Sequence, residues 1–353
     1  MKVAPLHGRR LWFPVALNVW PILLLVSQKL LLPIGLVFAS IGSRKTRQDV
    51  LVAIFVVGLT GLLLGVQRPN EYAVAHFAGY ALFMLAVPLI NDGLRASRTG
   101  LIRWLSIVSV LNAIFGIIFF VFEIDMTIFR GLNKIIDSEG VTTRIYFESA
   151  SLLAVFSLAS VRNKWIRRGG IVITAIYALF LAKSVLVVLL YAVNAVAYRV
   201  MRAPVSQRIL LGVAFLLLML VGPVAVALLR PDFMLSVGFK LLQIDLIFSD
   251  FGSPLVGRGW GYVIDAIATS EDQPYQVEMQ FPMLLLQMGV PAFFVYVIGM
   301  VYQIRSISGC GGVFYFRAGL YFLVGFSNPW MFLPSWYLTV ALMFAALDRR
   351  GSK

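Results

Sequence analysis

The segment at 256–262, VGRGWGY, sets three glycines at alternate positions around one arginine. Glycine permits positive φ and close approach of the backbone to a ligand. Successive N–H groups in such a turn can form a nest for an anion. Gly257, Gly259 and Gly261 are therefore candidate substrate-binding residues, and Arg258 is a candidate catalytic cation. A flexible turn that closes a long loop is the alternative interpretation.

A second candidate catalytic cation, Arg144, stands in the segment TTRIYFE at 142–148. We expect the chain to re-enter an apolar helix here from an outer loop. A guanidinium at such a boundary offers five donors in a planar fork, which suits a phosphate. Tyr146 beside it is a candidate substrate-binding residue. The alternative is an interfacial arginine paired with Glu148.

Glu278 is the candidate general base, in the segment QVEMQFP at 276–282 that opens an apolar run. A carboxylate just inside an apolar boundary is either paired or shifted toward its neutral form. Both states suit a group that orients or deprotonates a hydroxyl. Gln276 is a candidate substrate-binding residue beside it. The alternative is an acid that favours the N-terminus of a helix through the macrodipole.

Lys183 and Ser184 lie at the centre of thirty largely apolar residues. A lysine in such surroundings indicates an anion contact, so both residues are candidate substrate-binding residues. The alternative is a lysine whose ammonium group snorkels to the interface. Arg230 completes the substrate-binding candidates, although a contact with lipid headgroups is the simpler interpretation for it, as for Arg68 and Lys240.

The composition identifies the environment in which these residues must be positioned. The 353 residues are 60% hydrophobic and only 13% charged, with a mean hydropathy of +0.89. Soluble domains carry about 25% charged residues, so we expect lipid to surround most of this chain. Continuous apolar runs favour helices over a barrel. One cysteine and two histidines cannot form a His/Cys metal cage, and we expect neither a metal nor a cofactor.

The sequence therefore predicts an all-α polytopic membrane protein with about twelve transmembrane helices, several of them short. The predicted spans are 11–26, 29–42, 50–66, 73–90, 104–122, 146–161, 169–182, 185–198, 209–229, 277–303, 318–326 and 336–347. With both termini in the cytoplasm, most of the basic residues fall in inner segments and most acids in outer ones. This asymmetry is the usual signature of orientation, so the net charge of +14 does not indicate nucleic-acid binding.

Residues 1–353 are expected to form one membrane domain. Two outer loops, at 123–145 and 230–276, are long enough to carry short helices and function. Residues 236–248 could form an amphipathic helix on the outer leaflet, or an ordinary loop resting on headgroups. His76 is predicted to be a packed residue between helices. Trp330 and Trp336 are predicted to anchor the aromatic belt.

In organisation and short motifs the chain resembles the bacterial polysaccharide polymerase and O-antigen ligase superfamily (Wzy- and WaaL-type proteins with a GT-C-like membrane fold). The resemblance rests on Arg144 before a helix, on Lys183-Ser184 where the family often has Ser-Arg, and on the G-x-G-x-G element at 257–261. It also rests on the polar helix entry at 275–278, where the ligase-type histidine is absent. That absence favours a polymerase.

The resemblance implies a reaction and its partners. The donor would be an oligosaccharide on a polyprenyl pyrophosphate, and the acceptor a sugar hydroxyl of a second lipid-linked unit, with inversion at the anomeric carbon and without a metal. Arg144, Arg258 and Lys183 would converge on the departing diphosphate, and Glu278 would act on the acceptor hydroxyl. The location would be the inner membrane of a bacterium, and a chain-length regulator is a possible partner.

Two other functions are compatible with the pattern. An O-antigen or teichoic-type ligase would have the same fold and a different acceptor. A transporter or a flippase of lipid-linked oligosaccharides belongs to another class and places ionisable residues near the midplane, often within inverted repeats. In this sequence the charges gather at the outer boundary, and no convincing internal repeat is seen. A non-catalytic membrane scaffold is a further alternative.

Overall fold

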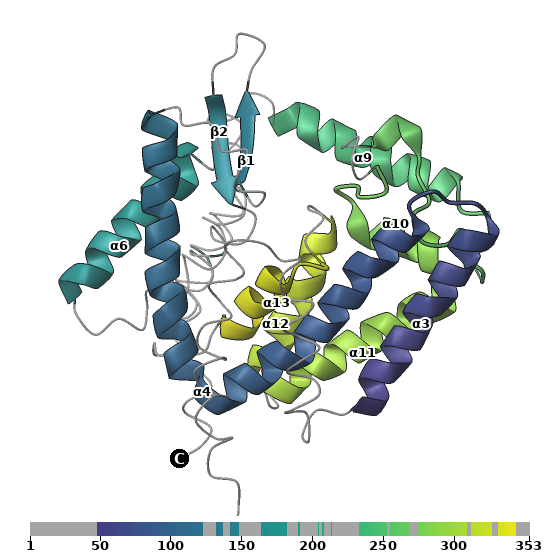
Figure 1. Cartoon of the computed structure of the whole chain (residues 1–353), viewed down its shortest axis with the longest axis horizontal. Coiled ribbons are helices and arrows are strands. Elements are labelled where there is room, and N and C mark those ends of the chain that lie inside the picture. Colours follow the sequence, from purple (N-terminus) through teal and green to yellow (C-terminus); the bar gives the residue numbers. More distant parts are fainter. Residues whose placement is uncertain are drawn as a thin grey trace, which may run out of the picture. The chain divides into compact units, whose positions relative to one another are not determined.

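The chain separates into two compact units, each described by itself below. One comprises Met1–Arg44 and Pro88–Asn194, and the other Lys45–Val87 and Ala195–Lys353. The computed structural model describes residues 48–122, 132–136, 142–147, 164–181, 233–252, 255–268, 274–308, 312–326 and 331–343, together with the single positions 190, 204, 207 and 213. These residues are mostly helical, as the composition predicts (Figure 1).

The predicted count of about twelve spans is not confirmed. Within the described ranges, only α11 (Val290–Ser308) is both long enough and apolar enough to cross a membrane. Shorter apolar helical stretches are Val52–Gln67, Ala73–Pro88, Ser109–Val121 and Gly312–Phe326. The predicted spans at 11–26, 29–42, 185–198 and 209–229 fall almost entirely outside the described residues.

The second unit begins with one helix and, after a tight turn, the first part of another, whose residues from Pro88 onward belong to the first unit. Helix α3 (Gln48–Gln67) confirms the predicted helix at 50–66 to within two residues. Helix α4 (Ala73–Val121) starts where predicted but continues through 49 residues, with Pro88 inside it. Two helices, at 73–90 and 104–122, joined by a basic loop were predicted, and that division is wrong. Straight-chain residues such as arginine are good helix formers, so the basic residues between these runs do not end the helix.

The segment predicted as one span at 277–303 is two helices, α10 (Gln280–Met288) and α11. They meet at Gly289, whose φ of +76° is in the region that favours glycine and ends a helix. The N–H of Gly289 still donates to the carbonyl of Leu285. Proline then stands at the second position of α11, where its missing N–H costs no hydrogen bond.

The end of the chain adds α12 (Gly312–Leu323), the 3-10 turn η5 (Val324–Phe326) and α13 (Pro334–Leu342). Arg317 of α12 is fully buried and donates from both Nε and Nη2 to the carbonyl of Met343, the C-cap of α13. Its Nη1 also donates to Ser308 at the end of α11. A cation at a helix C-terminus satisfies carbonyls that the helix leaves unpaired.

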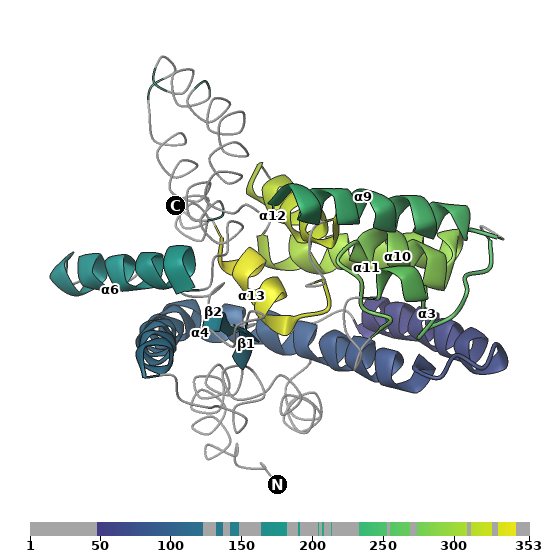
Figure 2. The ribbon, with the colours of Figure 1, turned by 90° about the horizontal axis from the view of Figure 1, so that it is seen from above.

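Helix α9 (Phe233–Ser249) contains the predicted helix at 236–248. It packs beside α10 (Figure 2). One face of α9 contributes Ile247 to a buried apolar cluster with Ile267 of the 3-10 turn η4 (Asp265–Ile267) and with Met283 of α10. Buried Gln243 links the same elements, because its Oε1 accepts the N–H of Met279.

An aromatic core holds the helices of the second unit together. His76 of α4 is buried. Its ring stacks on that of Tyr275, with 4.4 Å between the ring centroids, and packs edge-on against Trp260, with 4.6 Å between the centroids. The prediction of a packed histidine is confirmed. Trp336, predicted to lie in an aromatic belt, is fully buried and donates its indole N–H to the carbonyl of Tyr321, so that prediction is wrong. Trp330 is not among the described residues.

The first unit contains an element that the sequence did not predict. Strands β1 (Leu132–Ile136) and β2 (Thr142–Phe147) form an antiparallel pair with Ile135 opposite Arg144. The described elements are otherwise helical, as predicted, and this hairpin is a local exception in which Tyr146, predicted to begin a helix at 146–161, lies in a strand. Helix α6 (Lys164–Ile176) continues into the π-helical turn η3 (Tyr177–Leu181) and so starts before the predicted residue 169.

Candidate functional site

The glycine segment, residues 256–262, is bound on both sides by the backbone of its own unit. The N–H of Arg258 donates to Leu286 and that of Gly259 to Gln287, both at the end of α10. The N–H of Trp260 donates to the carbonyl of Gly61 in α3. The N–H of Gly261 lies 3.4 Å from Nδ1 of His76. Since all four donors have acceptors within the protein, the predicted anion nest is not formed.

The glycines are required instead by close packing. Gly259 has a φ of +88°, and a Cβ there would collide with the backbone of Gly65 in α3. Gly257 meets the backbone of Gln287 and Gly289 in the same way. Small residues allow the backbones of two elements to approach closely. These close contacts favour a fixed backbone over the alternative of a flexible turn.

Three side chains fix the glycine segment further. Nη1 of Arg68 donates to the carbonyl of Gly257 at 2.8 Å. The amide of Asn70 donates to the carbonyls of Arg258 and Trp260. The buried indole of Trp260 donates to the carbonyl of Gly58 at 2.7 Å. Arg68, predicted to contact headgroups, thus contributes a structural hydrogen bond.

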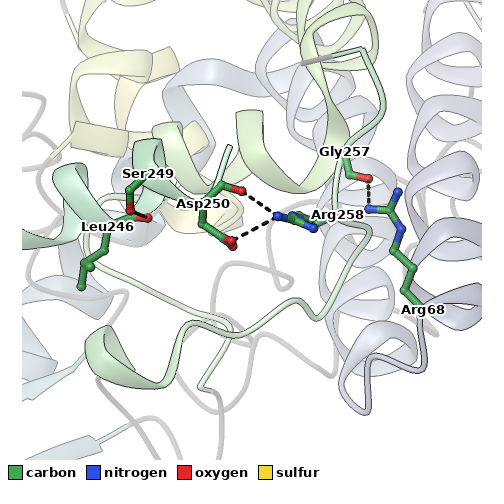
Figure 3. A network of polar contacts seen from close by, with 6 residues as sticks. All are labelled: Arg68, Leu246, Ser249, Asp250, Gly257 and Arg258. Carbon is green, nitrogen blue, oxygen red and sulfur yellow. Dashed lines mark hydrogen bonds and ion pairs between the residues drawn. The ribbon is translucent and has the colours of Figure 1, made fainter. Parts of the chain in front are cut away.

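This rigid segment presents the side chain of Arg258 at the end of α9 (Figure 3). Its Nη2 donates to the backbone carbonyl of Asp250 at 3.0 Å and to Oδ1 of the same residue at 3.1 Å. The guanidinium also lies over the ring of Tyr262, 5.6 Å from its centroid. The side chains of Arg258 and Asp250 are 36% and 31% exposed, so the ion pair remains open to solvent on one side.

The partners of Arg258 influence one another. Burial raises the pKa of Tyr262, and its hydrogen bond with Asp250 raises it further. Tyr262 therefore stays a neutral hydroxyl beside the carboxylate. The contacts of Arg258 use Nη2 and the ring face, which leaves Nη1 for a further acceptor such as a phosphate oxygen.

Glu278 has an ion-pair partner, one of the two outcomes expected for it. Its Oε2 lies 3.2 Å from Nζ of Lys240 in α9, with both side chains partly exposed. Helix α10 begins one residue beyond its N-cap, Met279, and has no side-chain cap. Glu278 precedes that cap, so it does not cap the helix. Gln276, nearby in the sequence, is half-buried and has an interaction partner of its own.

Glu278 pairs with a residue inside α9, and Arg258 pairs with the residue that follows its end. Their partners, Asp250 and Lys240, are ten residues apart, which is about 15 Å along a helix. The two candidate groups therefore flank the same helix without contacting a common residue of it.

The remaining candidates belong to the first unit or lie outside the described residues. Arg144 and Tyr146 both lie in strand β2, two residues apart. Lys183, Ser184 and Arg230 are outside the described residues. The π-helical turn η3 ends two residues before Lys183, and such turns are frequent near functional sites. The predicted convergence of Arg144 and Lys183 with Arg258 stays a prediction.

Sequence reasoning missed Asp250 and Tyr262 and did not pair Lys240 with Glu278. Asp250 precedes Arg258 by eight residues, and both lie outside the helices and strands of the described chain, so no periodicity relates them. Only the bend between α9 and the glycine segment brings the two side chains together. Tyr262 could have been suspected because it is a ring four residues from a cation in a glycine-rich turn.

No family model, curated protein or solved structure matches this chain. The resemblance to polysaccharide polymerases accordingly remains a prediction from motifs and organisation.

Proposed function

We propose that the chain is a membrane-embedded polysaccharide polymerase. It would transfer a glycan from a polyprenyl diphosphate to a sugar hydroxyl of a second lipid-linked unit. The observation that carries the proposal is Arg258, a guanidinium held rigidly at a solvent-open position with Nη1 available. A fixed cation of this kind stabilises charge that develops on a leaving diphosphate without reorganising first.

The outward faces of two helices support the membrane part of the proposal. On α3, large apolar side chains are exposed at 52, 56, 59, 63 and 66, a helical spacing that makes one continuous face. On α11, Phe294, Val295 and Ile298 are exposed. Contiguous exposed apolar surface is rare on soluble monomers, whereas lipid is a favourable environment for it.

The proposed reaction is an in-line displacement at the anomeric carbon. The bond from that carbon to the diphosphate oxygen breaks, and the electron pair leaves with the diphosphate. The acceptor hydroxyl oxygen forms the new bond on the opposite face, and its proton passes to the carboxylate of Glu278. Lys240 occupies Oε2 of Glu278, which leaves Oε1 to accept the proton.

The resemblance extends the proposed site to residues whose side-chain contacts are not described. Arg144 and Lys183 would add charge at the diphosphate, and Ser184, Tyr146, Gln276 and Arg230 would contact the substrate. The glycines at 257, 259 and 261 serve the site indirectly, because their close packing fixes the backbone on which Arg258 stands.

The test is complementation of a host from which the gene has been deleted. Arg258→Ala and Arg144→Ala should each abolish the polymer and accumulate single repeat units, with the protein still inserted in the membrane. Arg305→Gln, an exposed basic residue at the end of α11, is the matched control and should leave chain length unchanged. Free polymer that is not passed to an acceptor would select a ligase instead. Normal chain length in both arginine variants would overturn the proposal.

A further inference from the structure

Helix α6 and the turn η3 have two contrasting faces. On one face Gly170, Thr174, Tyr177 and Ala178 are buried. Tyr177 packs in a cluster with Ala113 of α4, and Gly116 of α4 lies too close to its ring for any side chain. The other face therefore points away from the described elements of its own unit.

The outward face carries a line of large apolar side chains. Val172, Ile176 and Phe180 follow one another at intervals of four residues, and all are exposed. At the start of the helix Trp165 is 79% exposed, with the guanidinium carbon of Arg168 at 5.8 Å from its ring centroid. Apolar residues at this spacing form one stripe along a helix.

The charge at the start of α6 is uniformly positive. Lys164, Arg167 and Arg168 fall within its first five residues, and Arg162 precedes them. The sequence contains no aspartate or glutamate from residue 149 to residue 231. The charge in this segment therefore complements an anionic ligand, and no acid nearby in the sequence compensates it.

The length of the apolar stripe on α6 matches the depth of one membrane leaflet. From Val172 to Phe180 the stripe covers about 12 Å along the axis, and the hydrocarbon of one leaflet is about 15 Å deep. Trp165 lies about 10 Å beyond Val172 along the same axis. At that level tryptophan and basic side chains meet lipid headgroups.

We propose that the first turns of α6 bind the headgroup of an anionic phospholipid, with Trp165 at the interface and the stripe from Val172 to Phe180 among its acyl chains. Arg168, whose guanidinium lies at the ring of Trp165, supplies charge that recognises the phosphate, and Arg167 adds a positive charge next to it in the sequence. This site is independent of the glycan chemistry proposed above, because it requires only that the chain lies in a bilayer. An acidic protein segment would fit the charge but would not account for the exposed apolar stripe.

The test is a lipid titration of the full chain in detergent, followed by native mass spectrometry. Phosphatidylglycerol should be retained in preference to phosphatidylcholine. The double substitution Arg167→Gln/Arg168→Gln should weaken phosphatidylglycerol binding about 30-fold, at about fivefold per lost basic residue. The control, Arg349→Gln/Arg350→Gln, removes the same charge at the end of the chain and should change binding little. Equal retention of both lipids, or equal loss in the control, would overturn the proposal.

A second measurement locates the helix without relying on charge variants. Cys310 is the single cysteine, so Cys310→Ser gives a background for nitroxide labels at Gly169→Cys and Ile176→Cys. A side chain at Gly169 would meet no neighbour within 4 Å, and Ile176 is exposed. In vesicles containing phosphatidylglycerol, the label at 176 should be accessible to oxygen and the label at 169 to a water-soluble nickel chelate. Nickel access at both positions would contradict insertion of the stripe.

Discussion

The guanidinium of Arg258 donates to the backbone carbonyl of Asp250 as well as to its carboxylate. The first contact does not depend on the charge of Asp250, so it holds the guanidinium in place even when the carboxylate is neutralised. The second contact competes with any anionic ligand for the same cation. Asp250 therefore has two separable effects, on the position of Arg258 and on its affinity for anions.

Asp250→Asn separates these effects. The amide keeps an acceptor for Nη2 and removes the competing charge. Because exposed ion pairs contribute about 0.2–1 kcal/mol, binding of a polyprenyl diphosphate should tighten by up to about fivefold. The measurement is a binding isotherm of the full chain in nanodiscs, with Asp245→Asn, an exposed acid on the same helix, as the control. Weakening by tenfold or more would show that the charge of Asp250 itself is required.

Gly259→Ala should destabilise the second unit. The φ of +88° and the collision of a Cβ with the backbone of Gly65 leave no relaxed position for alanine. Strain of this kind costs about 1–3 kcal/mol, and Tm in detergent should fall by several degrees. Gly79→Ala is the control, because a Cβ there meets nothing within 4 Å and helical alanine is favoured over glycine by about 0.5–1 kcal/mol. An unchanged Tm for Gly259→Ala would refute the close packing.

Trp260→Phe tests the hydrogen bond from the buried indole to Gly58. The substitution retains a ring but leaves the carbonyl of Gly58 without this donor. One hydrogen bond contributes about 0.5–1.5 kcal/mol net, so thermal unfolding should occur at a lower temperature. Trp165→Phe, at a highly exposed position, should shift the midpoint much less. Equal shifts for the two variants would mean that burial of Trp260 is not what stabilises the unit.

Arg317→Leu should destabilise the packing of α12 against the end of α13, although leucine can fill part of the buried space. The carbonyl of Met343 loses two charged donors, and Ser308 loses its contact with Nη1. Charged hydrogen bonds contribute about 1.5–3 kcal/mol each, so the end of the chain should become sensitive to limited proteolysis at temperatures where the wild type resists it. Arg305→Gln, exposed on α11, should resist like the wild type. Resistance in Arg317→Leu would contradict the role of this buried arginine.

Long apolar runs were predictable because burial and helical periodicity dominate them. Helices α3 and α9 agree with the predicted ranges to within about three residues. The joint at Gly289 was missed, although Pro291 follows it, because the flanking residues are apolar on both sides. The continuity of α4 was missed because its central basic residues were interpreted as a loop. Local composition does not distinguish a charged turn of helix from a charged connection.

The candidate site was predictable only in part. Arg258 and the glycines stand out in the sequence because their spacing is unusual, yet the purpose assigned to the glycines was wrong. Their N–H groups bind α3, α4 and α10, segments up to about 200 residues away. The partners Asp250 and Lys240 were missed for a similar reason, since tertiary packing brings them to Arg258 and Glu278. The type of a charged residue suggests its chemistry, whereas the identity of its ion-pair partner depends on the tertiary structure.

Equilibrium binding of a polyprenyl diphosphate to the full chain in nanodiscs tests most directly whether Arg258 binds the leaving group. The wild type should bind the diphosphate and not the corresponding polyprenyl alcohol. Arg258→Gln should bind it at least about tenfold more weakly, the loss expected for one charged hydrogen-bonded contact, with Tm unchanged. Equal affinity of the wild type and Arg258→Gln for the diphosphate would contradict the account.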